Sequence, residues 1–389
     1  MPDGGDALTV RMAERIAEIP AAAWNACADP ANPFVSYAFL EVLEASRSVA
    51  AKAGWAPRHI VAEDAQGRVV GVVPLYLKSH SYGEYVFDHG WADAYERAGG
   101  RYYPKLQAAV PFTPVPGPRL LVRPGGDAAA IRQALIESLA EITERLGVSS
   151  LHVTFCTADE AAAFKAAGWL IRNGRQFHWN NNGYKSFDDF LAALSHSRRK
   201  SIRRERRQVA EQGIEIDALT GSAIEPRHWD AFFEFYIATS DRKWGSPYLN
   251  RDFFHRLGAA MADRVLLVLP RQGKSYIAGA LNLIGADTLY GRNWGSHGEF
   301  PFLHFEACYY QAIDFAIRHG LQRVEAGAQG EHKIQRGYLP VPTFSAHWIP
   351  DSGFRKAVAS FLVRETEMIE HEVAALAGHS PFKTTEGCG

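Results

Sequence analysis

Two copies of one long sequence pattern constrain the fold of this chain more than any other feature. Residues 167–179 read AGWLIRNGRQFHW and residues 336–348 read RGYLPVPTFSAHW, so Gly, an aromatic residue, Leu and a closing His-Trp recur at the same offsets. Upstream, VVGVVPLYL at 69–77 matches IAGALNLIG at 277–285. Ordered matches over about 100 residues indicate that one domain was duplicated.

Each copy shows the pattern strand, turn, strand, helix, strand, helix, strand, which predicts mixed α/β sheets covered by helices, an α+β arrangement. At 389 residues the chain also exceeds what one hydrophobic core usually supports. The expected parts are an N-terminal domain at 1–180, a linker and basic helical arm at 181–213, a C-terminal domain at 214–350, a C-terminal helix at 351–378 and a tail at 379–389.

The bulk composition excludes several classes of protein. The formal net charge is -1, so any contact with nucleic acid or membrane must come from a local patch. The four cysteines are scattered without the spacing of a zinc site or a disulfide framework. No run approaches the roughly 18 apolar residues of a membrane span. We therefore expect a cytoplasmic protein without a metal site or a membrane span.

The helix EAAAFKAAGW at 160–169, which leads into LIRNGRQFHW, resembles the last helix, turn and strand of GNAT-type N-acyltransferases. Two such domains joined by a basic helix resemble the layout of the FemABX family. Over nearly the whole chain the sequence is similar to the FemAB-like branch, whose members are described as N-acyltransferases or as peptidoglycan biosynthesis or recognition proteins. The phrases that carry this likeness are YLKSHSYGEYVFDHGWADAY, YYPKLQAAVPFTPVPGPRLL, LHFEACYYQAIDFAI and GAQGEHKIQRGY.

The resemblance implies tandem GNAT-like domains and transfer of an acyl or aminoacyl group to an amine acceptor, a small molecule, a peptide or a cell-wall precursor. The donor would be acyl-CoA or aminoacyl-tRNA, used as a co-substrate, with no permanently bound cofactor. The alternative is a non-catalytic module that binds an anionic cell-wall precursor or RNA.

Comparison of the copies points to a catalytic segment. The slot that reads AAAFKAAGW in the first copy reads GEHKIQRGY in the second. Because the fold does not need charge there, the charged residues of the second copy are candidates for chemistry: Glu331, His332, Lys333 and Arg336. In GNAT enzymes this helix often supplies the group that protonates the leaving atom, a role the resemblance gives to Lys333 or His332. The alternative is a solvated helix end with an internal ion pair of Glu331.

The donor is expected around YGRNWG at 290–295 and the helix that follows it. In this alignment Arg292 matches His89, and an arginine on a central strand needs either a ligand or a buried partner such as Glu325. The usual pyrophosphate-binding loop of acetyl-CoA enzymes is not visible, and the spacing of His304 and Glu306 argues against zinc. The candidates for donor or anion binding are Arg292, Trp294, His304, Glu306 and Tyr338.

The acceptor is expected at the long segment 78–121, which is too rich in aromatic residues, Gly and Pro for an ordinary connection. Asp88 or His89 could serve there as a general base, or the aromatic residues could simply pack the loop. The candidates are Lys78, His80, Tyr82, Glu84, Asp88, His89, Tyr102, Tyr103 and Lys105.

The arm between the copies carries a dense positive charge. From Arg198 to Arg207, seven of ten residues are basic. Such a run is either a solvated helix or a contact for a phosphate-rich partner such as tRNA or a nucleotide-linked sugar. It lacks interleaved aromatic residues, so sequence-specific reading of RNA is not expected.

Overall fold

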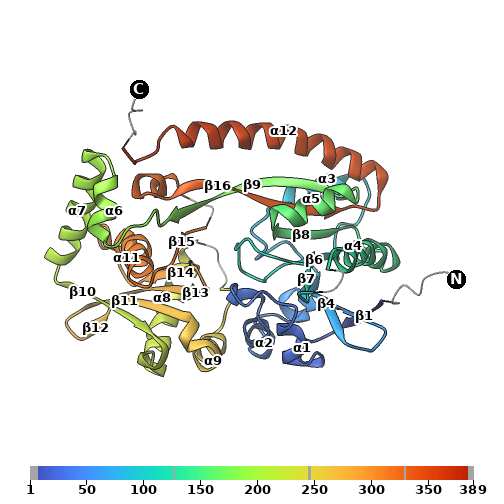
Figure 1. Cartoon of the computed structure of the whole chain (residues 1–389), viewed down its shortest axis with the longest axis horizontal. Helices are drawn as coiled ribbons and strands as arrows, with labels where there is room; N and C mark the ends of the chain where they lie inside the picture. The colour runs from blue at the N-terminus through green and yellow to red at the C-terminus, as the bar shows by residue number, and fades with distance from the viewer. Residues whose placement is uncertain (1–7, 126–127, 244–246, 328–329, 384–389) are drawn as a thin grey trace. The chain divides into compact units, whose positions relative to one another are not determined.

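The computed structural model describes residues 8–125, 128–243, 247–327 and 330–383, without the side chains of 240–243 and 331. The chain forms two compact units, coloured mainly blue to green and mainly yellow to orange in Figure 1. Unit 1 comprises Met1–Gly174 and Pro342–Ile369, and unit 2 comprises Arg175–Val341 and Glu370–Gly389. The domain limits expected from the sequence remain a prediction.

Unit 1 contains two groups of strands. An antiparallel group has the order β1, β3, β4, β7, and a second group has the order β2, β5, β6, β8, followed by the end of β16. The bounds are β1 (Thr9–Ala13), β2 (Trp55–Pro57), β3 (His59–Glu63), β4 (Val69–Val73), β5 (Leu75–Lys78), β6 (Lys105–Ala108), β7 (Leu121–Val122), β8 (Leu151–Cys156) and β16 (Leu339–Trp348). Every residue of β4 and β8 is buried; β4 is wholly apolar, whereas β8 also buries the polar side chains of His152 and Thr154.

The helices of unit 1 are α1 (Ala21–Asn25), α2 (Tyr37–Ala45), α3 (His89–Arg97), α4 (Ala128–Arg145) and α5 (Ala158–Ala166), with short 3-10 turns at Ile16–Glu18, Pro33–Val35 and Ala51–Ala53. Helix α4 packs on β4, β7 and β8. Helix α5 begins at a capping box, in which Thr157 accepts from the backbone of Glu160 and Glu160 accepts from that of Thr157.

The strands of unit 2 are β10 (Ile214–Thr220), β11 (Val265–Gln272), β12 (Ser275–Tyr276), β13 (Ala278–Ile284), β14 (Thr288–Ser296), β15 (Arg323–Glu325) and β9 (Leu170–Asn180), whose end pairs here. Their order is β10, β11, β13, β14, β15, β9, with β12 beside β11. Only the pair β14 and β15 is parallel among the pairs described in this unit.

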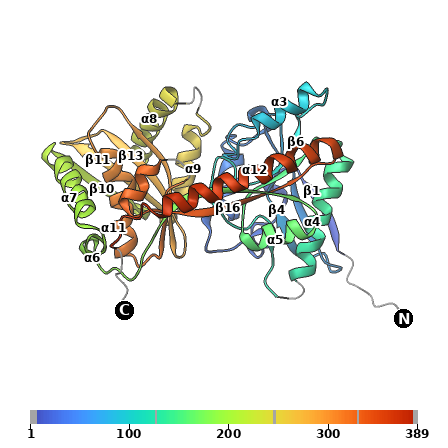
Figure 2. The ribbon, with the colours of Figure 1, turned by 90° about the horizontal axis from the view of Figure 1, so that it is seen from above.

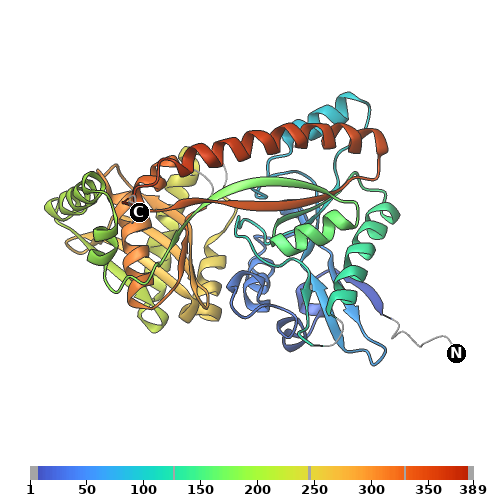
Figure 3. The same ribbon diagram turned by 45° about the horizontal axis from the view of Figure 1, so that its top comes forward.

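The helices of unit 2 are α6 (Phe187–Ala193), α7 (His196–Glu211), α8 (Pro226–Lys243), α9 (Arg251–Met261), α10 (Leu303–Phe305) and α11 (Gln311–Arg318). Shorter turns lie at Gly221–Ala223, Ala262–Arg264, a π-helical turn η6 (Glu306–Tyr310) and a 3-10 helix η7 (Glu331–Arg336). Ser186 caps α6 by accepting from the backbone of Asp189. Helix α8 packs on β13 and β14, and α11 on β14 and β15 (Figure 2). The last helix, α12 (Ser352–Ala377), is continuous over 26 residues (Figure 3).

The duplication is visible in the strand pairing. The series β5, β6, β8, β16 and the series β13, β14, β15, β9 both pair antiparallel, parallel, antiparallel. Strand β6 is therefore the counterpart of β14. The expected match of Arg292 with His89 was wrong, because His89 begins helix α3 while Arg292 lies in β14. Side-chain similarity there does not reflect equivalent backbone.

Candidate functional site

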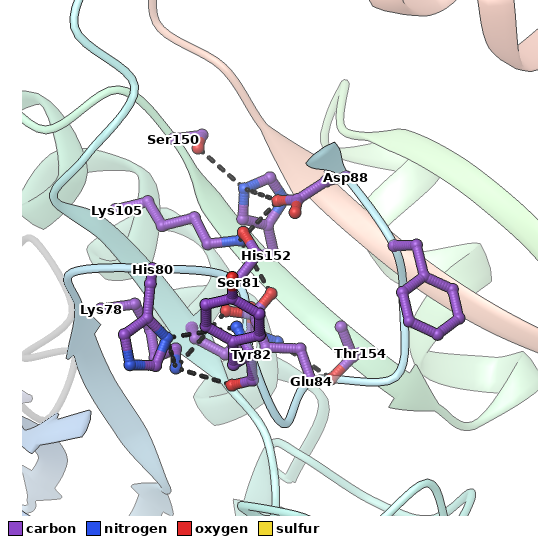
Figure 4. A network of polar contacts seen from close by, with 12 residues as sticks. Lys78, His80, Ser81, Tyr82, Glu84, Asp88, Lys105, Ser150, His152 and Thr154 are labelled. Carbon is purple, nitrogen blue, oxygen red and sulfur yellow. Dashed lines mark hydrogen bonds and ion pairs between the residues drawn. The ribbon is translucent and has the colours of Figure 1, made fainter. Parts of the chain in front are cut away.

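A buried network of charged side chains lies in unit 1, around β6 and the loop after β5 (Figure 4). At its centre, Lys105 Nζ donates hydrogen bonds to Ser81 Oγ at 2.8 Å, to Glu84 Oε2 at 2.7 Å and to Asp88 Oδ2. All three charges are buried, so each is stable only because the others are present. Burial alone lowers the pKa of Lys105, but the two carboxylates outweigh it and raise that pKa above the ordinary value.

Lys78, the last residue of β5, is the second buried ammonium of this network. Its Nζ donates to the carbonyl of Tyr82 at 3.1 Å and lies 3.7 Å from Glu84 Oε1. It also stands 3.6 Å from the centre of the Trp55 ring. Burial lowers the pKa of Lys78 to about 7 and raises the pKa of Glu84 to about 7. Both groups therefore titrate near neutral pH.

Asp88 connects Lys105 to a pair of buried histidines. The Tyr102 hydroxyl donates to Asp88 Oδ2 at 2.6 Å and lies 3.2 Å from His152 Nε2. On the other side of that ring, His152 Nδ1 lies 2.6 Å from Nδ1 of His347. Burial lowers the pKa of His152 to about 3 and that of His347 well below its ordinary value. Both rings are therefore neutral near neutral pH.

Eight of the nine acceptor candidates expected from the sequence lie in this network: Lys78, His80, Tyr82, Glu84, Asp88, Tyr102, Tyr103 and Lys105. His89 lies apart from it, exposed, with its ring 6.0 Å from that of Tyr82. Although burial raises the pKa of Asp88, the charge of Lys105 and its hydrogen bond bring that pKa below the ordinary value. A carboxylate held in that way is a weak general base.

The sequence comparison missed four members of the network: Ser81, Ser150, His152 and His347. A signal existed for His347, because it belongs to the His-Trp pair that closes the repeat. Within the repeat, that pair identifies an equivalent position in the two copies but does not indicate a polar contact. His152 lies in β8, whose residues are all buried, and no neighbouring residue in the sequence identifies it as part of a polar network.

A cavity of about 530 Å³ lies next to this network in unit 1. Its lining is mainly aromatic and apolar: Phe87, Gly90, Trp91, Ala94, Tyr95, Ala98, Arg172, Asp351, Gly353, Phe354, Ala357, Val358 and Phe361. Trp91 connects the two features, since its ring lies 4.9 Å from that of His347. Arg172 is fully engaged, donating to both carboxylate oxygens of Glu365 at 2.7 Å.

In unit 2, the segment that the repeat comparison singled out forms η7, which follows β15. Lys333 is 4% exposed, and its Nζ donates to the carbonyl of Ala326 at 2.6 Å and to that of Gly327 at 3.2 Å. Burial lowers the pKa of Lys333 to about 8. Its counterpart in the first copy, Phe164, is wholly buried in the apolar core of unit 1. The side chain of Glu331 lies outside the described part of the chain.

His332 is the half-buried member of η7. Its Nε2 lies 3.0 Å from the Tyr309 hydroxyl, and its ring centre lies 6.2 Å from that of His304. Burial, with the charges of Arg336 and Lys333, lowers the pKa of His332. Gly330 precedes it with φ 97°, and a Cβ there would come within 2.4 Å of the imidazole. Only glycine therefore lets the ring sit in this place.

Arg336 and Glu306 both enter ion pairs with α7. Arg336 Nη2 donates to both carboxylate oxygens of Glu205, at 3.0 and 2.9 Å. Arg206 instead uses two nitrogens, with Nε donating to Glu306 Oε2 at 3.1 Å and Nη2 donating to Oε1 at 3.0 Å. Tyr338 is fully buried, with its hydroxyl 3.4 Å from the carbonyl of Tyr309. Glu306 and Tyr338, expected at the donor site, thus have structural partners.

The other donor candidates gather at the end of β14. This strand pairs with β15 only over Thr288–Tyr290, and a bulge at Arg292 interrupts its pairing with β13. In the described part of the chain, the rest of β14 thus has a partner strand on one side only. Beyond the strand lies a cavity of about 600 Å³, lined by Thr239, Trp294, Ser296, Gly298, Glu299, Phe300, Pro301, Leu303 and His304. Trp294 and His304, with ring centres 5.4 Å apart, are the predicted donor residues that line it.

The described residues contain no group of three or more His, Cys, Asp or Glu side chains arranged to hold a metal ion. None of their helices combines the length and the apolar character that crossing a membrane requires.

Comparison with known proteins places the chain in a family. Residues 15–384 match the FemAB-like family, described as peptidoglycan biosynthesis/recognition. The crystal structure of FemX is 13% identical, with a TM-score of 0.55, and the match covers 88% of this chain and 98% of that one. L-PGS from Bacillus licheniformis is 8% identical, with a TM-score of 0.51 and coverage of 82% and 95%. No curated protein matches the sequence. These likenesses confirm the expected mixed α/β fold over nearly the whole chain, and the chain belongs to the FemAB-like family.

Proposed function

We propose that this protein is an acyltransferase that moves an acyl or aminoacyl group from an activated carrier to an amine, with the reacting centre in unit 2. One observation carries the proposal: His332, a neutral and half-buried imidazole, contacts His304 at the edge of a cavity that the one-sided strand β14 enters. An extended carrier arm can pair with such a strand edge through main-chain hydrogen bonds. Membership of a family described as peptidoglycan biosynthesis/recognition makes a cell-wall precursor the favoured acceptor.

The chemistry needs one proton carrier and one site for the oxyanion. The amine nitrogen attacks the acyl carbonyl carbon, a C–N bond forms, and the bond from that carbon to the carrier's oxygen or sulfur breaks. His332 takes the proton that the amine loses and returns it to the departing atom, so protons balance. Backbone N–H groups along the open edge of β14 stabilise the oxyanion.

Tyr309 suits His332 to this double task. Burial raises the pKa of Tyr309 well above its ordinary value, so the phenol keeps its proton. The phenol can accept from Nε2–H, which leaves Nδ1 basic, or donate to Nε2, which leaves Nδ1 as the donor. Taking up the proton at Nδ1 gives the imidazolium, and giving it back from Nδ1 to the departing atom restores the Nε2–H tautomer. Lys333, bound to two carbonyls, holds η7 in place and adds positive charge near the leaving group.

The charge of α7 favours an RNA-borne donor. Its four exposed basic residues are spaced three, four and seven apart and so share one face: Lys200, Arg203, Arg204 and Arg207. Ile202, Glu205 and Val209 face the opposite way and are buried. A row of cations on one helix face can contact several successive phosphates of an RNA backbone, which is more positive charge than the headgroup of a single CoA needs. Aminoacyl-tRNA is therefore the proposed co-substrate, and acyl-CoA is the other arm of the test.

The acceptor is assigned to unit 1. The network around Lys105 fixes the loop between β5 and α3, and Tyr82 at the tip of that loop is 60% exposed. A rigid loop with exposed aromatic rings is suited to hold a ligand.

The test is a transfer assay on the full chain with two donor panels, aminoacyl-tRNAs and acyl-CoAs, and amine acceptors that include peptidoglycan precursors. Amide formation is followed by mass spectrometry. The proposal expects turnover with the tRNA panel. Turnover with acyl-CoAs alone would identify acyl-CoA as the donor in place of aminoacyl-tRNA. Ligand binding without turnover of either panel would favour a binding module instead.

A further inference from the structure

We infer that Glu205, a residue of the basic helix α7, is a positioning residue for His332 and acts through Arg336. The inference rests on the proposed function, in which His332 carries the proton. It assigns a role in the reaction to a side chain that the sequence pattern placed only within a run of charge.

The contacts form one continuous chain from α7 to η7. Both carboxylate oxygens of Glu205 accept from Arg336 Nη2, and Oε2 also accepts from the Tyr310 hydroxyl. Arg336 Nη1 in turn donates to the backbone carbonyl of His332 at 2.8 Å. The guanidinium also lies 3.4 Å from the centre of the Phe305 ring, which is itself 5.4 Å from the ring of His332. Glu205 thus holds the guanidinium of Arg336 in place. Arg336 in turn holds the backbone carbonyl of His332 and the Phe305 ring that packs beside the imidazole.

Attachment of α7 alone does not account for this pair. Ile202 and Val209 already bury the inner face of the helix, and Arg206 binds Glu306 by two hydrogen bonds. Glu205 and Arg336 are 8% and 5% exposed, and a buried ion pair generally costs desolvation that an apolar pair would avoid. The first copy has apolar Phe164 in the slot of Lys333 and no charge is needed there. The buried pair is therefore explained by what it does to η7.

The π-helical turn η6 joins the two ends of this chain of contacts. Its neighbouring residues Tyr309 and Tyr310 contact different partners, His332 and Glu205. π-helical turns are rare and occur often at functional sites. One turn of helix therefore fixes both the imidazole and the carboxylate that positions it.

The charges around His332 determine the direction in which its pKa should change when Glu205 or Arg336 is replaced. The titratable and charged groups that face this ring are Tyr309 from η6, His304 from α10, and Lys333 and Arg336 from η7, with Glu205 behind Arg336. Arg336 and Lys333 both lower the pKa of His332. Removing Glu205 leaves the positive charge of Arg336 uncompensated, while removing Arg336 takes that charge away. The two losses act on His332 in opposite directions.

The experiment compares Glu205→Gln and Arg336→Gln in the full chain. The ring signal of His332, assigned by its loss in His332→Ala, is titrated by NMR without substrate, and the pH dependence of kcat/KM is measured with the active donor panel. Glu205→Gln should lower the apparent pKa of His332 and Arg336→Gln should raise it, each by about half a unit to one unit. The acid limb of kcat/KM should move the same way.

A matched control is Glu215→Gln, which breaks an exposed pair with Arg271 in the same unit and should leave the titration unchanged. Equal titration of His332 in both test variants and wild type would overturn the inference, as would shifts of the same sign. The two claims fail separately. Opposite shifts without any turnover would keep the positioning role and remove the proposed function, whereas turnover without shifts would do the reverse. Arg336→Lys, which keeps the charge, should titrate closer to wild type than Arg336→Gln and so separates charge from loss of packing.

Discussion

His152 and His347 lie 195 residues apart in the chain, yet their Nδ1 atoms are 2.6 Å apart in the core of unit 1. A contact of this length requires one ring to donate and the other to accept, so the pair holds a single proton between these atoms. Both rings are buried, and this burial, together with the positive charges of Lys105 and Arg172, disfavours protonation of either ring. The pair therefore depends on both histidines remaining neutral.

Acid should destabilise the protein through this pair. The folded pKa of His152 is about 3 and that of His347 is also depressed, whereas an unfolded histidine titrates near 6.5. As the pH falls below 6.5 the unfolded chain takes up protons that the folded chain does not, so the free energy of unfolding falls. The expected loss is about 1.4 kcal/mol per pH unit for each histidine. Urea unfolding between pH 6.5 and 4.5 measures it.

The matched variants for that experiment are His347→Asn and His89→Asn. Removing His347 should reduce the slope of unfolding free energy against pH by about one proton. His89 is exposed, so its removal should leave the slope as in wild type. An unchanged slope in His347→Asn would show that this ring is not held neutral by the fold.

Replacing Lys105 by methionine should be strongly destabilising. The change leaves the buried carboxylates of Glu84 and Asp88 without their common partner, at an expected cost of about 3–5 kcal/mol. Lys165→Met removes an exposed lysine of the same unit and should cost little. Chemical denaturation at pH 7 gives both values. A similar, small loss in both variants would mean that the network does not depend on its central ammonium.

His304→Ala should impair transfer, while His297→Ala should not. His304 lines the cavity of unit 2 and contacts His332, whereas His297 is exposed and does not line that cavity. We expect kcat to fall by about tenfold in the first variant, since the ring of His304 helps to position His332, the group that carries the proton. Steady-state assays with the active donor panel check this. Equal rates in the two variants would place the reaction elsewhere.

The exposed face of α7 should govern binding of an RNA donor. Changing Lys200, Arg203, Arg204 and Arg207 together to glutamine should weaken binding of aminoacyl-tRNA and lower the slope of log K against log salt by up to about 4. The control changes four exposed arginines elsewhere in unit 2: Arg227, Arg251, Arg256 and Arg264. Fluorescence anisotropy at several salt concentrations gives both slopes. The same loss in both variants would indicate non-specific attraction.

Much of the architecture could be predicted from the sequence because a duplication leaves paired signals. The Leu and His-Trp positions of the two copies do occupy equivalent strands, β9 and β16, and the Gly and aromatic positions directly precede them. The match of His89 with Arg292 was wrong because sequence likeness over six residues cannot distinguish a strand from a loop and helix start. Only the pairing of β6 with β5 and β8 reveals the true counterpart of β14.

Residues of the candidate sites differed in how visible they were. The charges of η7 stood out because Phe164 supplied an apolar reference for Lys333. His152 could not be found, since its partner His347 lies far away in sequence and only the fold brings them together. Glu205 was hidden for a related reason: within a basic run a glutamate looks like local charge balance, and its bond to Arg336 spans 131 residues.

The most direct test of the account is the single-turnover rate of amide formation by the full chain, compared between wild type and His332→Ala. Donor and amine are present at concentrations that saturate their binding sites. His297→Ala, a change of an exposed histidine in unit 2, serves as a control for handling and folding. The account predicts amide formation by wild type and a rate about 100- to 10,000-fold lower in His332→Ala, with donor binding retained. Amide formation at the wild-type rate in His332→Ala would contradict it.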